Sequence, residues 1–263
     1  MKYGFIGCGN MGGALARAVA AVTPDIMLCD RNTEKANALA EKLGVCTGTD
    51  TDVAEACDRI FLGVKPQVMR SAIAEISSKL REKKPLLITM AAGIEIKTLE
   101  EMIGASVPII RIMPNTPVEV GKGLVLYCAN ALVTDRMLND FLEDMRFAGK
   151  TVSLNENLID AGCALSGCGP AFVYMFIEAL ADGAVSCGLP RSNATEFAAQ
   201  TLIGSAEMVL RSGKHPGELK DNVCSPGGST ICGVKALEDG GFRSAVINAV
   251  VESFKKNMKL GND

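Results

Sequence analysis

Two adjacent glycines followed by two hydroxyl residues, Gly227–Thr230, form the stretch of the chain best suited to binding a small anion. The glycines have no Cβ atoms, so a ligand can approach the backbone closely. Residues 231–238 are expected to form a helix, and Ser229 or Thr230 can cap its first turn. The free N–H groups and the positive dipole end of such a helix suit a carboxylate. Taken alone, residues 224–230 are more typical of a flexible capped loop.

A glycine-rich turn near the N-terminus has the spacing of a dinucleotide-binding loop. It follows the apolar run Tyr3–Ile6 and precedes a helix expected at residues 14–21. In Gly-x-Gly-x-x-Gly, the first glycine permits a tight turn, the second lets a pyrophosphate approach the backbone, and the third allows close helix–strand packing. The motif alone is weak evidence, but a second apolar run, Ile26–Cys29, follows at the right distance. The residues predicted to contact the dinucleotide here are Gly7, Gly9, Asn10, Met11 and Gly12.

The residues after this second run bear on which dinucleotide is bound. An acidic residue at this point commonly binds the ribose 2′-hydroxyl of NAD, whereas an arginine commonly accommodates the 2′-phosphate of NADP. This chain has Asp30 followed by Arg31 and Asn32. A guanidinium matches a phosphate bidentately, and Asn32 can add a hydrogen bond. We therefore expect NADPH, while Asp30 leaves NADH open; an Arg31 that is merely solvated at a helix start is the less favoured alternative.

Short apolar runs alternate with helical segments through the first 150 residues. Further strands are expected at residues 45–46, 59–64, 86–90, 109–113 and 123–129, with helices at 34–43, 52–57 and 68–83. This alternation predicts an α/β fold with a Rossmann-like, doubly wound parallel sheet. In such a sheet the ligand lies outside the carboxyl ends of the strands. Those ends are expected at Gly7–Gly12, Val64–Pro66, Ala91–Gly93 and Met113–Thr116.

From about residue 152 the pattern changes to long alanine-rich helices. They are expected at residues 156–165, 171–186, 194–211 and 242–258, separated by breaks that contain glycine or proline. The sequence thus predicts a dinucleotide-binding Rossmann domain at residues 1–151 and an all-helical dimerisation and substrate-binding domain at residues 152–263. Helices so rich in Ala, Val and Ile are expected to bury surface against a second subunit, which makes an enclosed dimer the simple inference.

Composition restricts the class of function and the compartment. The 263 residues are 48% hydrophobic and 22% charged, which is ordinary for a soluble globular protein. The net charge of −3, without a basic run and without Trp, disfavours a nucleic-acid or membrane surface. Ten cysteines with no Cys-x-x-Cys pair, and His215 as the single histidine, disfavour zinc or another metal and fit a reducing, cytoplasmic compartment.

Neither a signal peptide nor a membrane span is expected in this sequence. The N-terminal apolar stretch faintly resembles a signal peptide, but its five glycines and Arg17 are better explained by a strand, a turn and a helix. No run reaches the roughly 18 uninterrupted apolar residues of a membrane span. We therefore expect no membrane partner.

Six segments spread along the chain match one enzyme family. They are Gly4–Gly12, Val64–Gln67, Ala91–Gly93, Arg111–Pro117, Leu165–Ala171 and Lys220–Thr230, the last followed by Gly233 and Leu237-Glu238. With these segments the chain resembles the pyrroline-5-carboxylate reductases; the first segment is shared by many dehydrogenases, whereas the last is close to diagnostic. The resemblance implies NAD(P)H-dependent reduction of the ring imine of 1-pyrroline-5-carboxylate to L-proline, the last step of proline biosynthesis. It also implies an interlocked homodimer, sometimes assembled into a decamer.

The resemblance also implies roles for individual residues. Backbone N–H groups of Gly227, Gly228, Ser229 and Thr230 would hold the substrate carboxylate, and the Thr230 hydroxyl, as the catalytic group, would meet the ring nitrogen. Ser225 and Asn222 would shape the pocket. The implied cofactor contacts are Arg31 and Asn32 at the 2′-phosphate and Val64, Lys65, Pro66, Ala92 and Gly93 along the rest of the molecule. One departure from the family is Asp50, where members often have an asparagine near the adenosine ribose; its charge is unfavourable beside a 2′-phosphate.

Two other classes of function compete with this reading. The β-hydroxyacid dehydrogenases begin almost identically, but resemblance to them would call for a lysine early in the helical domain, and residues 155–170 contain none. Hydride transfer to a protonated imine depends on positioning more than on a strong acid, and neither His215 nor Lys220 is expected to be a catalyst. An NADP-sensing or pyridoxal-type binding protein derived from a reductase is the non-enzymatic alternative, which the intact Gly-Gly-Ser-Thr stretch disfavours.

Overall fold

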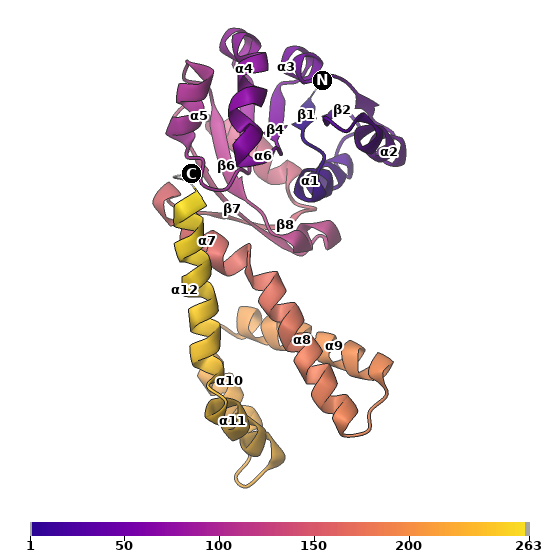
Figure 1. Ribbon diagram of the computed structural model, residues 1–263, viewed down its shortest axis with the longest axis vertical. Helices are drawn as coiled ribbons and strands as arrows, with labels where there is room; N and C mark the ends of the chain where they lie inside the picture. Colours follow the sequence, from indigo (N-terminus) through magenta and orange to yellow (C-terminus); the bar gives the residue numbers. More distant parts are fainter. Residues whose placement is uncertain (1, 261–263) are drawn as a thin grey trace. The chain divides into compact units, whose positions relative to one another are not determined.

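Apolar runs in the first half of the chain form most of the strands of one sheet, in a computed structural model that describes residues 2–260. Within these residues the sheet has eight strands in the order β3-β2-β1-β4-β5-β6-β7-β8. Figure 1 labels six of them, β1, β2, β4, β6, β7 and β8. Their bounds are β1 Tyr3–Ile6, β2 Ile26–Cys29, β3 Cys46–Thr47, β4 Arg59–Leu62, β5 Leu86–Thr89, β6 Ile109–Met113, β7 Gly123–Ala129 and β8 Gly149–Ser153. Every pairing is parallel except that of β6 with β7. The expected doubly wound sheet is confirmed.

Helices cover both faces of the sheet because the central strands are apolar on both sides. All residues of β1, β5 and β6 are buried. On one face the core is completed by α3 (Asp50–Ala56), α4 (Pro66–Lys83) and α5 (Ile96–Ile103). On the other it is completed by α1 (Asn10–Ala20), α2 (Thr33–Leu43) and α6 (Asp135–Asp144). Two continuous apolar cores therefore hold the strand ends in fixed positions.

The strand order reverses between β1 and β4, and glycines let the backbone close at this point. Gly7 follows β1 with a φ of +98°, which favours glycine. A Cβ atom on Gly63, after β4, would lie 2.5 Å from the Gly7 carbonyl oxygen, and one on Gly12 would lie 2.1 Å from the same oxygen. The carboxyl ends of β1 and β4 thus meet α1 at contact distance. A reversal of this kind is where α/β sheets bind ligands.

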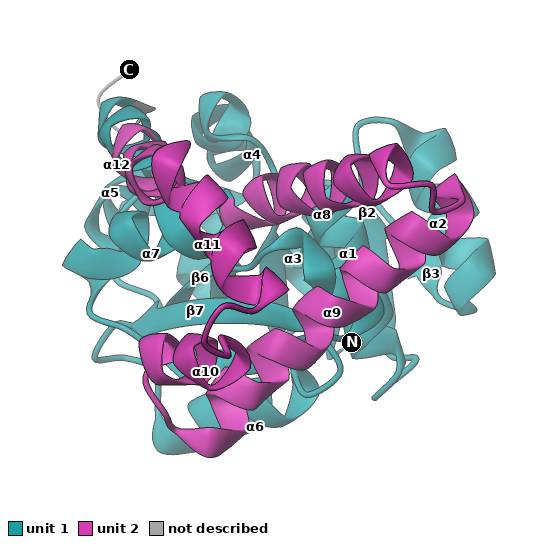
Figure 2. Cartoon of the chain, turned by 90° about the horizontal axis from the view of Figure 1, so that it is seen from below, with its two compact units in different colours: residues 1–168, 253–263 teal, residues 169–252 magenta. Residues whose placement is uncertain are grey.

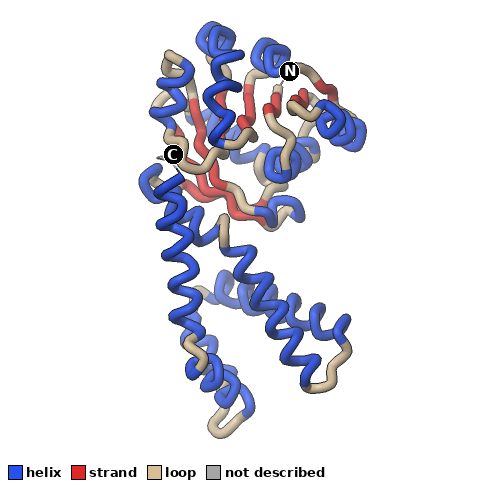
Figure 3. The backbone as a smooth tube through the Cα atoms, viewed as in Figure 1, coloured by secondary structure: helices blue, strands red, loops and turns tan. Residues whose placement is uncertain are grey.

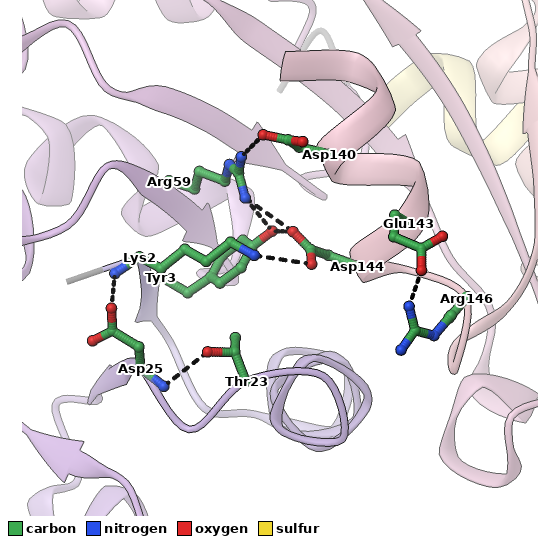
Figure 4. A network of polar contacts seen from close by, with 9 residues as sticks. All are labelled: Lys2, Tyr3, Thr23, Asp25, Arg59, Asp140, Glu143, Asp144 and Arg146. Carbon is green, nitrogen blue, oxygen red and sulfur yellow. Dashed lines mark hydrogen bonds and ion pairs between the residues drawn. The ribbon is translucent and has the colours of Figure 1, made fainter. Parts of the chain in front are cut away.

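A network of polar side chains connects the amino-terminal ends of β1 and β4 to the end of α6 (Figure 4). The Arg59 Nη1 atom donates to the Tyr3 hydroxyl and to Asp144 Oδ2, at 2.9 Å in both cases. The Tyr3 hydroxyl also donates to Asp144 Oδ2, and Lys2 Nζ lies 3.2 Å from Asp144 Oδ1. Burial, followed by the hydrogen bond to Asp144, raises the pKa of Tyr3, so this hydroxyl keeps its proton. Since Tyr3 and Arg59 begin β1 and β4, the network stabilises the fold away from the reversal point.

Removal of the central carboxylate should destabilise the protein. Asp144→Ala leaves the Tyr3 hydroxyl without its acceptor, and leaves Arg59 with Asp140 and the Tyr3 hydroxyl as its partners. We expect the free energy of unfolding to fall by about 2–3 kcal/mol, measured by urea denaturation. The neighbouring exposed pair gives a matched control: Glu143→Ala, which breaks the contact with Arg146, should lower it by less than about 1 kcal/mol. Equal losses in the two variants would contradict this assignment.

Residues 169–252 form a second compact unit that is helical throughout (Figures 2 and 3). It contains α8 (Gly169–Ser186), α9 (Arg191–Ser212), α10 (Pro216–Val223), α11 (Ser229–Asp239) and most of α12 (Phe242–Leu260). The unit that contains the sheet extends to Cys168 and includes the end of the chain from Ser253, so it is larger than residues 1–151. The helical C-terminal region is confirmed, and the functional boundary at 151/152 stays a prediction.

Several elements differ from the expectation. The helix expected at 156–165 is a 3-10 turn at Glu156–Leu158 followed by α7 (Ile159–Ser166). Strand β8 and helices α5 and α6 were not expected: β8 is an edge strand with no buried residue, and α6 buries only Phe141 and Asp144. The helical stretch Glu156–Ser186 is long and apolar enough to cross a membrane by length and composition alone.

Candidate active site

The glycine-rich turn has open space where a phosphate would lie. Helix α1 begins at Asn10, and its N-cap residue Gly9 makes no side-chain capping bond. A Cβ atom on Gly9 would have no other heavy atom within 4 Å, whereas one on Gly12 would collide with backbone. The first N–H groups of a helix have no partner within it and attract anions. The turn therefore fits the pyrophosphate of a dinucleotide.

Asp30 has a structural role beside this turn. Its Oδ2 atom accepts a hydrogen bond from the Cys8 N–H at 2.7 Å, and its Oδ1 atom accepts one from the Asn32 N–H at 2.9 Å. The Asn32 side-chain oxygen in turn caps α2 by accepting from the Lys35 N–H at 3.1 Å. Asp30 thus ties the glycine-rich turn to the end of β2, with each carboxylate oxygen bound by a backbone donor.

Arg31 extends away from this tether toward α4. Its Nη2 atom donates to the Ser71 hydroxyl at 3.2 Å, and the side chain is otherwise exposed. The guanidinium therefore spans from the β2–α2 connection to α4, on the edge where the carboxyl ends of β2, β1 and β4 lie next to each other. A phosphate at this corner would meet four further N–H donors of the guanidinium.

Asp50, the residue that departs from the family pattern, is directed at a thiol. It is the first residue of α3, and its Oδ1 atom accepts from Cys29 Sγ at 2.8 Å. Burial and then this hydrogen bond raise the pKa of Cys29; burial and the charge of Asp30 raise the pKa of Cys8 to about 12. Both thiols are therefore protonated at neutral pH and are poor nucleophiles.

The other residues predicted for the cofactor follow neighbouring strands. Val64, Lys65 and Pro66 come after β4, where Lys65 is the N-cap of α4 and Pro66 its first residue. Ala92 and Gly93 come after β5, and Gly93 has a φ of +74°. Because β1, β4 and β5 are parallel, these segments share one edge of the sheet with the glycine-rich turn. The structure thus places them along one edge, and their individual contacts stay predictions.

The Ser-Pro-Gly-Gly sequence before α11 forms a tight turn. The Gly228 N–H donates to the Ser225 carbonyl at 3.0 Å, and Gly227 has a φ of +70°. Proline second and a positive-φ glycine third are typical of a type II turn. Ser229 is the first residue of α11 and Gly228 its N-cap, without a side-chain bond. The expectation that Ser229 or Thr230 caps the helix is therefore wrong, because both lie inside it.

This turn limits which groups can bind an anion. The Gly228 N–H is used within the turn, whereas the Gly227, Ser229 and Thr230 N–H groups and the hydroxyls of Ser229 and Thr230 can still donate to a ligand. Asn222 lies in α10 and, like Ser225, is exposed. His215 caps α10 by accepting from the Gly217 N–H at 3.1 Å, as expected for a capping residue. The predicted substrate residues thus gather around one turn of the helical unit.

The two groups of predicted residues lie on different units. Those for the cofactor are all in the unit of the sheet, and those for the substrate are all in the helical unit. Sequence reasoning missed a hollow of about 260 Å³ beside the glycine-rich turn, lined among others by Arg17, Lys35, Lys42 and Glu119. The sequence did contain a pattern that could have indicated this hollow. Asn10 and Arg17 are seven residues apart, as are Lys35 and Lys42, and this spacing places the two members of each pair about two helical turns apart on one helix face.

Known proteins match this chain along nearly its whole length. A family model for pyrroline-5-carboxylate reductase dimerisation matches residues 156–260, and one for NADP oxidoreductase, coenzyme F420-dependent, matches residues 2–93. The pyrroline-5-carboxylate reductase of Escherichia coli (strain K12) is 44% identical over 264 residues, covering 98% of each chain. That of Arabidopsis thaliana is 42% identical over 266 residues, covering 98% of this chain and 95% of the relative. A crystal structure of Plasmodium falciparum pyrroline carboxylate reductase with NADP bound has a TM-score of 0.88 at 35% identity, covering 99% of this chain and 98% of that one.

Proposed function

Because this chain belongs to the pyrroline-5-carboxylate reductase family, we infer that it reduces 1-pyrroline-5-carboxylate to L-proline by hydride transfer to the ring imine. The observation that carries this function is the 44% identity over 98% of both chains. NADPH is the cofactor, in agreement with the NADP oxidoreductase match and the NADP-bound relative, and NADH is not excluded. The expected enzyme, reaction and cofactor are thereby confirmed.

We propose that one group of residues binds the cofactor and another binds the substrate. The open backbone at Gly9 and the first N–H groups of α1 hold the pyrophosphate, and the bound nicotinamide supplies the hydride. The N–H groups of Ser229 and Thr230 hold the substrate carboxylate at the positive end of α11. The Thr230 hydroxyl then meets the ring nitrogen and orients the imine, which is the catalytic role proposed for it.

Turnover with each reduced cofactor tests the function directly. The purified protein is mixed with 1-pyrroline-5-carboxylate and NADPH or NADH, the nicotinamide absorbance is followed, and proline is identified as the product. We expect turnover with both cofactors and a higher kcat/KM with NADPH. A folded protein that binds NADPH but turns over neither mixture would contradict the reductase function and favour the binding-protein alternative.

Arg31 is proposed to select NADPH through its 2′-phosphate, with Asn32 as a second donor. Arg31→Ala removes a charged donor set worth about 1.5–3 kcal/mol, so the Kd for NADPH should rise about 10- to 100-fold. The Kd for NADH should change less than about twofold, because NADH has no phosphate there. Binding is measured by nicotinamide fluorescence, with Arg136→Ala, an exposed arginine of α6, as the matched control. Equal weakening of NADPH and NADH would exclude this role.

The chain is a homo-oligomer that acts on a small molecule, as its dimerisation match indicates. We propose that the oligomer is an interlocked dimer, with a decamer as its larger form. In support, the helical unit exposes an apolar groove of about 560 Å³ between α8, α11 and α12, lined among others by Phe172, Phe176, Leu180, Phe242 and Val246. We also propose that a second copy, not a membrane, covers the apolar stretch Glu156–Ser186, and that the enzyme is cytoplasmic. Sedimentation of the purified protein without detergent tests the assembly.

A further inference from the structure

Arg111 is a buried cation that pairs with two carboxylates from the segment after β8. It lies in β6, and its side chain is 1% exposed. Its Nη1 atom lies 3.3 Å from Glu156 Oε1, and its Nη2 atom lies 3.5 Å from Asp160 Oδ1. Its Nε donor makes no hydrogen bond to residues 2–260. A buried charge is costly unless it is paired, so Arg111 constrains where both carboxylates lie.

One of these carboxylates also caps a helix. Glu156 Oε1 accepts a hydrogen bond from the Ile96 N–H at 2.8 Å. Ile96 is the first residue of α5, and the N-cap residue Glu95 makes no side-chain capping bond. The first N–H groups of a helix have no partner within it, so a carboxylate there satisfies a donor and meets the positive end of the helix dipole. Glu156, 60 residues further along the chain, therefore takes the place of a local capping residue.

The cap fixes one end of a connection that is held loosely by its own hydrogen bonds. The connection from β5 to α5 contains Ala92 and Gly93, which are predicted to contact the cofactor. The hydrogen bonds that the Met90 and Ala91 N–H groups donate are both 3.5 Å long, beyond the usual range of about 2.7–3.2 Å. The 2.8 Å bond from Ile96 is therefore the stronger restraint on this connection.

This connection belongs to the half of the sheet that takes the nicotinamide. A doubly wound sheet of this strand order consists of two mononucleotide-binding halves. Arg31, proposed to bind the 2′-phosphate of the adenosine, follows β2 in the half built on β1 to β3. The half built on β4 to β6 therefore takes the nicotinamide mononucleotide. The position of the β5–α5 connection then affects where the hydride donor lies relative to the imine.

We propose that Glu156 and Arg111 are positioning residues for the nicotinamide. Arg111 fixes the Glu156 carboxylate, and that carboxylate holds the start of α5 and with it the preceding connection. The inference rests on the proposed function and adds to it residues that act through the backbone. Asp160 pairs with the same guanidinium but makes no hydrogen bond to the β5–α5 connection among residues 2–260. It shares the ion pair without the cap, which makes it the matched control.

Amide exchange of the protein without cofactor tests the cap itself. Glu156→Ala should raise the hydrogen–deuterium exchange rate of the Ile96 amide about tenfold, because the acceptor is gone. Asp160→Ala should change this rate less than about twofold. Glu156→Gln keeps a side-chain oxygen that can accept the bond and should retain most of the protection. Equal exchange in Glu156→Ala and the unaltered protein would overturn the cap.

Cofactor binding and turnover test the positioning. In Glu156→Ala, kcat should fall about tenfold because the hydride donor is misplaced, while the Kd for NADPH rises about threefold or less. Adenosine 2′,5′-bisphosphate lacks the nicotinamide, so its Kd should change less than about twofold. The fluorescence emission of bound NADPH, which reports the surroundings of the nicotinamide, should shift. Glu156→Gln should recover most of the lost kcat.

Asp160→Ala separates positioning from a loss of stability. Each alanine variant removes one carboxylate from the buried Arg111, so both should lower the melting temperature by similar amounts. Only Glu156→Ala should lower kcat and shift the emission of bound NADPH. Equal losses of kcat in the two variants, or a loss that Glu156→Gln does not recover, would overturn the positioning role.

Ile96→Pro removes the donor and leaves the ion pair of Arg111 in place. Proline is tolerated at the first position of a helix, and the extended backbone of Glu95 suits a residue that precedes proline. This variant should reproduce the lower kcat and the shifted emission of Glu156→Ala; an unaltered kcat and emission would overturn the proposal. If the unaltered protein does not reduce 1-pyrroline-5-carboxylate, the reductase function alone is refuted, and the exchange and emission comparisons still decide on the positioning role.

Discussion

Gly228→Val is expected to abolish turnover while NADPH still binds. A Cβ atom at this position would lie 2.3 Å from Ser225 Oγ and 3.2 Å from the Ser225 carbonyl oxygen. The two further methyl groups of valine would stand in front of the Ser229 and Thr230 N–H groups, where we place the carboxylate. Two hydrogen bonds to a charged group, at about 1.5–3 kcal/mol each, correspond to a loss of about 10²- to 10⁴-fold in kcat/KM.

Cofactor binding and a smaller substitution make this test specific. The residues proposed for NADPH lie in the other unit, so the Kd for NADPH should stay within about twofold of the unaltered value. Gly228→Ala should lose less activity, because its only contact below 3 Å is with the Ser225 hydroxyl, which can rotate. Circular dichroism and sedimentation verify the fold and assembly of both variants. Unchanged kcat/KM in Gly228→Val would remove the carboxylate from this turn.

Gly9 and Gly12 lie in one turn, but we expect Gly12→Ala to lower the stability of the protein and Gly9→Ala to lower its affinity for NADPH. At Gly12 the added methyl group would stand 2.1 Å from the Gly7 carbonyl oxygen, so we expect the free energy of unfolding to fall by about 3 kcal/mol. At Gly9 it would enter open space, and the backbone φ of −61° suits alanine. Stability should then change by less than about 1 kcal/mol, while the Kd for NADPH rises about 10- to 100-fold.

Calorimetry and urea denaturation of the two variants separate these outcomes. Gly44→Ala is a matched control for a glycine away from the ligand: it follows α2 at a φ of +66° with no neighbouring atom, so only the left-handed backbone is affected. Its stability should fall by about 1 kcal/mol with NADPH binding unchanged. If Gly9→Ala binds NADPH normally, the pyrophosphate does not lie against this backbone.

The parts of the fold that followed from sequence are those with strong local patterns. β1, β4 and β5 are almost fully buried, so their apolar runs are uninterrupted and easily recognised. The edge strand β8 buries no residue, and its pattern therefore carries no apolar signal. The helix α5 has only eight residues, which is too short for its apolar stripe to stand out from noise.

The candidate site was predictable in composition but not in hydrogen bonding. Gly227-Gly228-Ser229-Thr230 could be recognised as an anion-binding turn from residue types alone. The Gly228 N–H is used by the Ser225 carbonyl because Gly227 has a positive φ, and Ser229 starts the helix instead of capping it because the Gly228 backbone is extended. In the same way, Asp30 has the residue type of a ribose ligand, yet its carboxylate is engaged by N–H groups from two separate segments. Such choices between acceptors are made by tertiary geometry.

The network around Tyr3 also limits how early the chain can complete its fold during translation. Tyr3 belongs to β1, which is synthesised before the other seven strands described here, and its partner Asp144 follows 141 residues later. Closing so long a loop is slow, and domains synthesised from the N-terminus cannot complete contacts with residues not yet made. The first strand must therefore wait, with its polar partner missing, until translation has passed α6. Nascent chains arrested before residue 144 should accordingly remain sensitive to protease, whereas chains arrested well beyond it should acquire resistance.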